Sequence, residues 1–151
     1  MSKSELHIRT AQAADLTSIL AVYREAGLAS RGSLSAGEAV TIFTRMQGYP
    51  NYKVYAAELQ GRIVGTFELA ILDNLANAGR PSGLVEDVAV LPSFQRQGIG
   101  KEMMRFAMDR CRDNKCYKMA LSSNERRAAA HRFYESLGFT RHGFSYALQL
   151  D

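Results

Sequence analysis

The sequence predicts one domain of mixed α/β fold, in which a sheet is covered by helices on both faces. The length of 151 residues fits one domain and leaves little room for a second. Hydrophobic residues make up 46% of the chain and charged residues 23%, which is the composition of an ordinary globular protein rather than a disordered or fibrous one. Segments with the two-residue period of strands alternate with segments of helical period, which favours a mixed sheet.

The N-terminal part predicts a strand followed by two helices. Apolar and polar residues alternate over 6–9, which is typical of a short strand. Asp15 has the place of an N-cap before a segment whose apolar residues recur at helical spacing, and Gly27 ends this helix. Ser35 and Glu38 then have the spacing of a capping box, which predicts the start of a second helix.

The middle of the chain predicts a hairpin, a loop and a third strand. Strands are expected over 52–59 and 62–72, and the Gln-Gly pair between them suits a tight turn. Residues 73–83 have the Asn, Gly and Pro content of a loop, which is long enough to bind a ligand. The apolar run 84–91 predicts a strand that the following proline ends.

The C-terminal part predicts two further helices between strands. Residues 100–113 carry apolar side chains on one helical stripe, and residues 116–121 have the character of a strand. A last helix is expected over 128–137, with Gly138 at the position that ends it. One or two strands are expected over 139–150. The element order is therefore β-α-α-β-β-β-α-β-α-β, with room for another strand at the end.

The segment between the strand at 84–91 and the helix at 100–113 has the features of an anion site. Its two glycines permit backbone conformations in which successive N–H groups converge on one anion. The helix has no Ser, Thr, Asp or Asn to cap its start, and Arg96 and Lys101 add positive charge at the positive end of its dipole. A bound phosphate or pyrophosphate relieves both costs. The segment consists of Gln95, Arg96, Gln97, Gly98, Ile99, Gly100 and Lys101.

Two better-known phosphate motifs do not fit this segment. A P-loop needs an earlier glycine and a Ser or Thr after the lysine, where this chain has Glu102. A dinucleotide fingerprint needs a third glycine, where this chain has Met103. ATP and NAD are therefore disfavoured. The alternative that involves no ligand is a glycine-rich connection with incidental basic residues.

A second motif joins the first to make a family pattern. Residues 95–100 fit the pattern Q/R-x-x-G-x-G/A at every fixed position, after the apolar strand at 85–90. Residues 131–139 fit the pattern F-Y-x-x-x-G-F in the expected order and at the expected distance. With both motifs the chain resembles the GNAT superfamily of N-acetyltransferases, which use acetyl-CoA. The likeness covers residues 84–145 well, and it implies a mixed, mostly antiparallel central sheet in a single domain over 1–151.

The resemblance also implies which residues bind acetyl-CoA. In the family the turn holds the pyrophosphate of CoA, the preceding strand presents its backbone to the pantetheine arm, and the tyrosine lies near the sulfur. Arg127 stands where many members have an asparagine, so a contact from Asn124 stays open. Carried over by position, the cofactor-binding residues are Val88, Ala89, Val90, Gln95, Arg96, Gln97, Gly98, Ile99, Gly100, Lys101, Asn124 and Tyr134.

Acetyl transfer to an amine needs a proton acceptor, because the amine is mostly protonated at neutral pH. Glu86 and Asp87 are the candidates, since they lie on the strand expected to face the cofactor. Adjacent strand residues point to opposite faces, so one of the two is expected to face the substrate, and Glu86 is preferred. Tyr134 can donate a proton to the leaving thiolate. The structural alternatives are carboxylates paired with arginines and a tyrosine packed in the core.

The leading hypothesis is an acetyl-CoA-dependent N-acetyltransferase that transfers an acetyl group to a primary amine of a small molecule by direct attack in a ternary complex. The alternatives are a protein or peptide N-acetyltransferase, an acyl-CoA-binding sensor without catalysis, and a nucleic-acid-binding module on the basic residues around 96–132. The net charge is +4, but no nucleic-acid-binding motif is present, so no nucleic-acid partner is expected. The local sequence also resembles aminoalkylphosphonate and glucosamine-phosphate acetyltransferases, but the sequence does not identify the acceptor amine.

Location and assembly are less constrained. No apolar run approaches the roughly 20 residues of a membrane span, so no membrane partner is expected. The first residues lack the apolar stretch of a signal peptide, and two cysteines fit a reducing compartment, so a cytoplasmic location is expected. The spacing of Cys111 and Cys116 matches no zinc motif, and no metal is expected. Family habit allows a homodimer.

Overall fold

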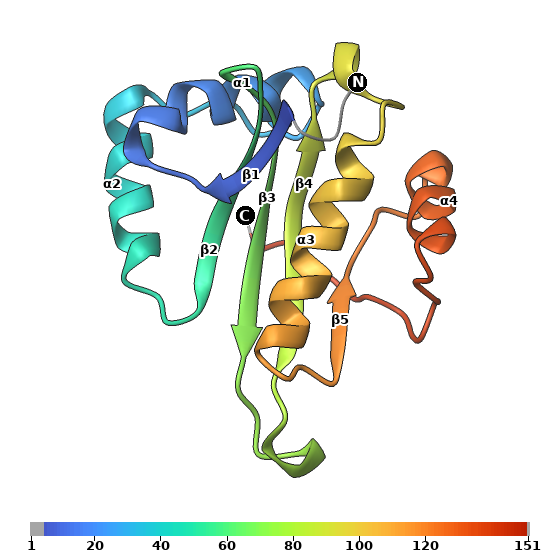
Figure 1. Ribbon diagram of the computed structural model, residues 1–151. Helices are drawn as coiled ribbons and strands as arrows, with labels where there is room; N and C mark the ends of the chain where they lie inside the picture. Colours follow the sequence, from blue (N-terminus) through green and yellow to red (C-terminus); the bar gives the residue numbers. More distant parts are fainter. Residues whose placement is uncertain (1–4, 151) are drawn as a thin grey trace. The chain divides into compact units, whose positions relative to one another are not determined.

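The central element is a five-stranded sheet with strand order β1-β2-β3-β4-β5 (Figure 1). The structure is a computed structural model, and it describes residues 5–150. Neighbours from β1 to β4 are antiparallel, while β5 points the same way as β4 in Figure 1. The predicted mixed, mostly antiparallel sheet is therefore confirmed. The strands are β1 (Leu6–Thr10), β2 (Tyr52–Leu59), β3 (Arg62–Leu72), β4 (Ser82–Val90) and β5 (Lys118–Leu121).

The chain divides into two compact units, Met1–Ala120 and Leu121–Asp151. The described part of the first unit holds β1 to β4, most of β5, and the helices α1 (Leu16–Glu25), α2 (Ala36–Gln47) and α3 (Ile99–Asp113). The described part of the second unit holds α4 (Ala128–Ser136). No helix within residues 5–150 is long and apolar enough to cross a membrane.

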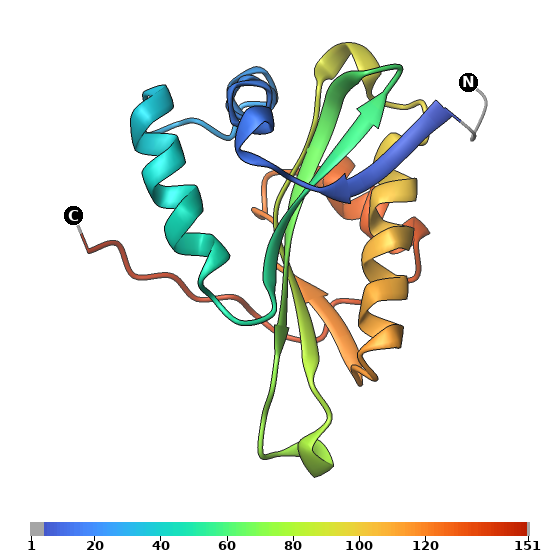
Figure 2. The ribbon, with the colours of Figure 1, turned by 60° about the vertical axis from the view of Figure 1, so that its left-hand side comes forward.

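In the first unit α1 and α2 cover one face of the sheet, and α3 covers the other (Figure 2). On the α3 face, Phe67 stacks on Tyr55 at 5.0 Å between ring centroids, and Tyr55 meets the edge of Phe106 at 5.2 Å. The predicted apolar stripe of the helix is buried here, which confirms helices on both faces. Its buried members are Ile99, Met103, Met104, Ala107 and Cys111.

The starts of the two N-terminal helices differ in how they are capped. The Ser35 hydroxyl accepts from the Glu38 N–H at 3.2 Å, and the Glu38 carboxylate accepts from the Ser35 N–H at 2.8 Å, which confirms the capping box. Asp15 precedes α1 as predicted, but its side chain does not cap that helix. Its carboxylate accepts from the Gln12 N–H at 2.7 Å and from the Arg9 guanidinium at 2.7 Å. A short helical turn, Ala13–Asp15, precedes α1 and puts Asp15 at its third position, where the carboxylate accepts from the turn's N-cap residue, Gln12.

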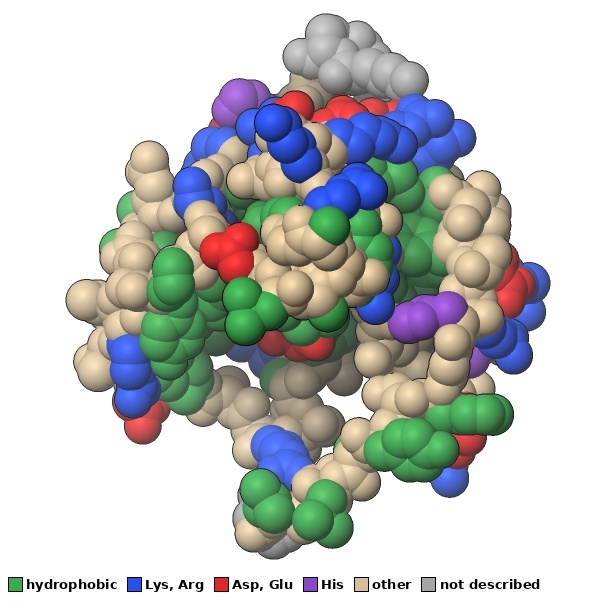
Figure 3. Space-filling model, turned by 90° about the horizontal axis from the view of Figure 1, so that it is seen from below, with side chains coloured by type: hydrophobic (Ala, Val, Ile, Leu, Met, Phe, Trp, Pro, Cys, Tyr) green, Lys and Arg blue, Asp and Glu red, His purple; other side chains and the backbone are tan. Residues whose placement is uncertain are grey.

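The hairpin of β2 and β3 has the predicted boundaries. Gln60 and Gly61 have φ angles of +51° and +77°, which are the positive values that a two-residue hairpin turn requires. β4 begins at Ser82, two residues earlier than predicted, so the loop before it is shorter and contains a single turn at Asn77–Gly79. Figure 3 views the molecule from the end that carries this loop, and hydrophobic side chains lie at the surface there. Leu75 is one of the fully exposed residues.

The second unit confirms the last helix and contradicts the last strands. Gly138 has a φ of +94°, and the N–H groups of Gly138 and Phe139 donate back to the carbonyls of Glu135 and Tyr134, which closes α4 as predicted. Residues 139–150 form no strand, so that prediction is wrong. The segment keeps a strand-like alternation, but a strand also needs a backbone to pair with, and nothing in the local sequence supplies one.

Candidate active site

A β-bulge interrupts β4 at the two candidate carboxylates. Glu68 of β3 lies opposite Glu86, but Thr66 lies opposite Ala89, so two steps on β3 match three steps on β4. Asp87 has a φ of +49°, which fits the one extra residue of a bulge. Glu86 and Asp87 are both exposed, so the expected strict alternation does not hold here. The bulge brings both carboxylates out at one point of the strand.

A buried carboxyl group lies behind this bulge. Glu68 is 8% exposed, and the Tyr52 hydroxyl donates a hydrogen bond to its carboxylate. Burial raises the pKa of Glu68, the Tyr52 hydrogen bond opposes this, and the charges of Asp87 and Glu86 raise it further. Burial, followed by the charge of Asp87, also raises the pKa of Glu86. Glu68, Glu86 and Asp87 therefore share one region, and the raised pKa values of Glu68 and Glu86 favour holding a proton there.

The tyrosines complete this carboxyl cluster. Tyr23 projects from α1, so the cluster lies on the α1 and α2 face of the sheet. Its hydroxyl is enclosed and meets no partner at hydrogen-bonding geometry. Burial and the charge of Glu68 raise the pKa of Tyr23, and burial with the Glu68 hydrogen bond raises that of Tyr52.

The sequence analysis missed Glu68, Tyr52 and Tyr23. One signal for Glu68 was present, because it is the only charged residue between Ile63 and Leu72 in an otherwise apolar strand. A charge in such a run is rare without a partner or a function. The tyrosines have no comparable signal, since tyrosine is common in strands and on amphipathic helices.

The glycine-rich turn leads from β4 into α3. Arg96 and Gly98 have φ angles of +60° and +85°, and no side chain caps the helix. The first backbone hydrogen bond of the helix runs from the Glu102 N–H to the Gly98 carbonyl at 3.0 Å, so the N–H groups of 99–101 have no acceptor within the helix. A methyl group added at Gly98 would meet nothing within 4 Å. The turn is thus open and rich in N–H donors, as a pyrophosphate site needs.

Some side chains of this turn form hydrogen bonds that stabilise the turn, and others are exposed to solvent. Those of Gln95 and Gln97 donate to the carbonyls of Val90, at 3.1 Å, and Ser93, at 3.2 Å, so both brace the turn. The Ile99 side chain is buried at 1% exposure, which leaves only its backbone for a ligand. The basic side chains at 96 and 101 are exposed. Contacts to an anion therefore come from backbone N–H groups and these two cations.

The remaining predicted residues, Tyr134 and Asn124, belong to the second unit. Burial raises the pKa of Tyr134, against a smaller opposite effect of Arg127. Its ring meets the edge of Phe139 at 5.7 Å. The Asn124 side-chain oxygen accepts from the Arg126 N–H at 2.9 Å, so it shapes the turn before α4. The carboxylates and the glycine-rich turn, by contrast, both belong to the first unit.

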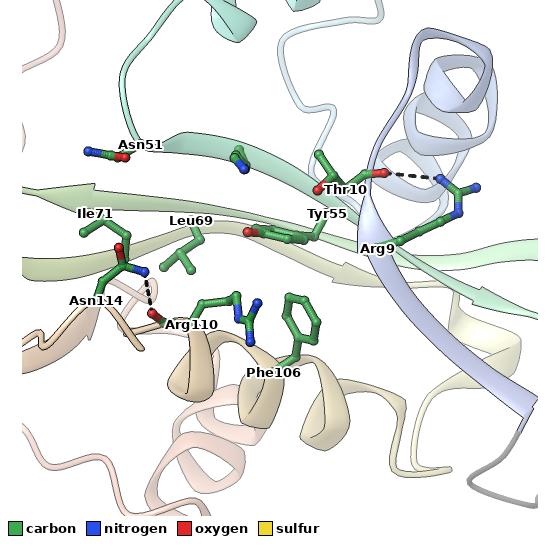
Figure 4. A pocket seen from close by; sticks show the side chains of 10 residues that line it. Arg9, Thr10, Asn51, Tyr55, Leu69, Ile71, Phe106, Arg110 and Asn114 are labelled. Carbon is green, nitrogen blue, oxygen red and sulfur yellow. Dashed lines mark hydrogen bonds between the residues drawn. The ribbon is translucent and has the colours of Figure 1, made fainter. Parts of the chain in front are cut away.

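A groove on the α3 face is a different feature (Figure 4). Its cavity is about 370 Å³, and none of its lining residues is acidic. The Arg9 guanidinium at its rim pairs with Asp15 and Glu58 at 2.7 and 2.8 Å. Arg110 lies over the Phe106 ring at 5.2 Å from the centroid. Because the groove lacks a proton acceptor and lies on the opposite face from the carboxyl cluster, it is not the candidate site for transfer to an amine.

The buried thiol of the chain, Cys111, is poorly suited to act as a nucleophile. Cys111 and Cys116 are both free, and Cys111 is buried on α3. Burial raises the pKa of Cys111 to about 12, so little thiolate forms at neutral pH. Within residues 5–150 no group of three or more acidic, histidine or cysteine side chains is gathered that could hold a metal ion.

Comparisons with known proteins identify the family of the chain. The sequence profile of the acetyltransferase (GNAT) family matches residues 18–139. A glucosamine 6-phosphate N-acetyltransferase of Trypanosoma brucei brucei is 34% identical over 140 residues, which cover 91% of each chain. An aminoalkylphosphonate N-acetyltransferase of Salmonella typhimurium is 30% identical over 101 residues, 67% of this chain and 65% of that one.

The solved structures show the same fold. The crystal structure of an acetyltransferase of Trypanosoma brucei has a TM-score of 0.83 and 32% sequence identity, over 96% of this chain and 99% of that chain. The family profile, over residues 18–139, includes both the carboxyl cluster and the glycine-rich turn. The chain is therefore an acetyltransferase of the GNAT family.

Proposed function

We propose that this chain is an acetyl-CoA-dependent N-acetyltransferase whose acceptor is a small primary amine that carries a phosphate or phosphonate group. One observation carries the proposal: β4 runs directly from exposed carboxylates at a bulge to an uncapped helix start rich in N–H donors. A proton acceptor and an anion site thereby lie on one stretch of chain. Relatives named for glucosamine 6-phosphate and for aminoalkylphosphonates support a phosphorus-containing amine.

The turn fits the pyrophosphate of acetyl-CoA. When it is bound, acetyl-CoA supplies the thioester carbonyl that the amine attacks. The backbone N–H groups of 99–101 and the cations at 96 and 101 would hold the pyrophosphate. The backbone of 88–90, beyond the bulge, would pair with the pantetheine arm as an added strand. We include Asn124 and Tyr134 of the second unit among the residues that contact CoA.

In this mechanism Glu86 accepts the proton that the ammonium group loses, and Asp87 is the second candidate. Their exposure on the bulge lets either carboxylate reach a substrate. Tyr134 donates a proton to the thiolate that leaves, since its raised pKa keeps it protonated at neutral pH. Direct attack in a ternary complex is supported because the buried Cys111 offers no thiolate for a covalent intermediate.

The two compact units act as one catalytic domain over 1–151 in this proposal. The family profile spans 18–139 and so crosses the boundary after Ala120, which supports a shared function. Both cysteines are free, which supports a cytoplasmic setting. No nucleic-acid or membrane partner is part of the proposal.

We also propose a homodimer. Phe144, Tyr146, Leu148 and Leu150 are each 82–90% exposed at alternate positions. This alternation gives the segment one apolar face, and a second copy of the chain could bury it.

A thermal-shift titration with acetyl-CoA, CoA, ATP and NAD tests the proposed cofactor. We expect stabilisation by acetyl-CoA and CoA and none by ATP or NAD. Thiol release is then measured with glucosamine 6-phosphate, 2-aminoethylphosphonate and a lysine-containing peptide. Release with either phosphorus-containing amine supports the proposal, and release with the peptide alone replaces it by a peptide acetyltransferase. Stabilisation without release from any amine identifies a sensor.

A further inference from the structure

Glu68 is the one carboxyl group among residues 5–150 that is buried. The groups that face it come from three elements: Tyr23 on α1, Tyr52 on β2, and the Glu86–Asp87 pair on β4. The hydroxyl of Tyr52 donates to it, and Thr66 beside it on β3 donates instead to the Tyr55 carbonyl at 2.8 Å. No lysine or arginine belongs to this set. The surroundings of Glu68 therefore neutralise its charge poorly, and a proton is the missing partner.

The ladder places Glu68 next to the exposed carboxylate. Glu68 and Glu86 are direct cross-strand partners in the antiparallel β3–β4 pair, and such partners have Cβ atoms about 4.5–5.5 Å apart on one face. Two glutamate side chains at this separation can share a proton directly or through one water. Glu86 is exposed and Glu68 is enclosed, so a proton that reaches Glu86 has a second acceptor further inside.

We propose that Glu68 is a positioning residue for proton removal: held by Tyr52 and paired across the ladder with Glu86, it takes up through Glu86 the proton that the acceptor ammonium loses. An N–H bond of the ammonium breaks and an O–H bond forms on Glu86. The proton then passes to Glu68, which returns Glu86 to its anionic form. The amine lone pair forms the C–N bond while the C–S bond of the thioester breaks, and the proton later returns to solvent by the same route.

This inference deepens the proposed function and rests on it. It explains two features that Glu86 alone leaves without a reason, namely a buried carboxyl inside an apolar strand and a tyrosine hydroxyl that holds it in place. A merely structural pair of Tyr52 and Glu68 would tie β2 to β3 and would leave the pH dependence of catalysis unchanged.

The test compares Glu68→Gln and Tyr52→Phe with wild type. Glutamine keeps the shape and can still accept from Tyr52, so Glu68→Gln should fold. We expect its kcat to fall at least tenfold, and the acidic limb of its kcat/KM–pH profile to move to lower pH, because the buried acceptor is gone and only the exposed Glu86 remains. Tyr52→Phe removes the hydrogen bond that lowers the pKa of Glu68, so its acidic limb should move to higher pH.

The matched control is Glu58→Gln, which removes a half-buried strand carboxylate that pairs with Arg9 instead. Its pH profile should equal that of wild type. The dissociation constant of acetyl-CoA should be unchanged in all three variants. A second readout needs no cofactor: in ¹³C NMR of the side-chain carboxyl groups, the pKa of Glu68 should lie above the ordinary value of a glutamate, and Glu86→Gln should lower it.

The outcomes separate the inference from the proposed function. If wild type transfers acetyl and the acidic limb of the kcat/KM–pH profile is the same in Glu68→Gln, the role of Glu68 is overturned and the enzyme assignment stays intact. A Glu68 resonance that ignores Glu86→Gln overturns it as well. A wild-type chain that binds acetyl-CoA but transfers acetyl to no amine overturns the proposed function itself. An acidic limb that moves to lower pH in Glu68→Gln and to higher pH in Tyr52→Phe supports the passage of the proton from Glu86 to Glu68.

Discussion

At the residue scale, the environment of a side chain decides what chemistry it can perform. Burial raises the pKa of Tyr134, so its hydroxyl stays protonated across neutral pH. A protonated phenol can donate to a developing thiolate and cannot act as a base. Glu68 and Glu86 show the converse, since their raised pKa values favour proton uptake.

Tyr134→Phe tests the proton donor. The substitution removes only the hydroxyl, and the contact of the ring with Phe139 can remain. We expect kcat to fall roughly 10- to 100-fold because a general acid is lost, while the acetyl-CoA dissociation constant stays near wild type. Steady-state kinetics and a binding titration measure the two quantities. Tyr117→Phe, at a half-exposed tyrosine of the first unit, is the matched control. Undiminished turnover would remove Tyr134 from the mechanism.

At the element scale, two irregularities give the elements of the first unit their proposed roles. The bulge in β4 turns a regular strand into one that presents adjacent carboxylates. The uncapped start of α3 leaves three backbone N–H groups available for an anion. A regular strand and a capped helix would pack equally well, so these departures from regularity point to ligand binding rather than to stability.

Gly98→Val tests the helix start. A β-branched residue at a φ of +85° carries about 1–3 kcal/mol of strain, and its side chain would project beside the N–H donors. We expect at least a tenfold loss of acetyl-CoA affinity, measured by calorimetry. Gly27→Val is the control, because Gly27 has a φ of +80°, equally open space and a place after α1. The pyrophosphate site is supported if both variants lose the same melting temperature and only Gly27→Val still binds CoA. Wild-type affinity in Gly98→Val would contradict the pyrophosphate assignment.

At the scale of the whole molecule, the C-terminal segment carries apolar side chains that a single chain leaves exposed to solvent. Residues 139–150 carry alternating large apolar side chains and form no strand. Four such side chains in water are unfavourable by the apolar area that they expose, at about 25 cal/mol per Å². A second copy that buries them would recover this free energy.

A triple variant with Phe144→Ser, Tyr146→Ser and Leu148→Ser tests this assembly. We expect sedimentation velocity to show a dimer for wild type and a monomer for the triple variant, since the apolar face is removed while the buried residues of the first unit are untouched. The control variant carries Thr140→Ser and Gln149→Ser at two exposed residues, and it should remain a dimer. A monomeric wild type across micromolar concentrations would contradict the proposed homodimer.

Most of the fold could be predicted from local patterns. The capping box at Ser35, the two-residue turn after β2 and the end of α4 at Gly138 each depend on residues within one or two turns of chain. The glycine-rich turn belongs to the same class, because its uncapped helix start and its basic residues are adjacent in sequence. The family itself followed from two short motifs.

Long-range pairing decided the rest. Asp15 binds Arg9 and the Gln12 N–H and does not cap α1, because a short helical turn at Ala13–Asp15 comes before that helix. The bulge at Asp87 depends on the register with β3. The surroundings of Glu68 include Tyr52 of β2 and Tyr23 of α1, which lie 16 and 45 residues away in the chain. Residues 139–150 have the alternation of a strand but no partner strand. Periodicity thus determines which local structure a segment favours, while pairing and burial, which are properties of the assembled chain, determine its chemistry.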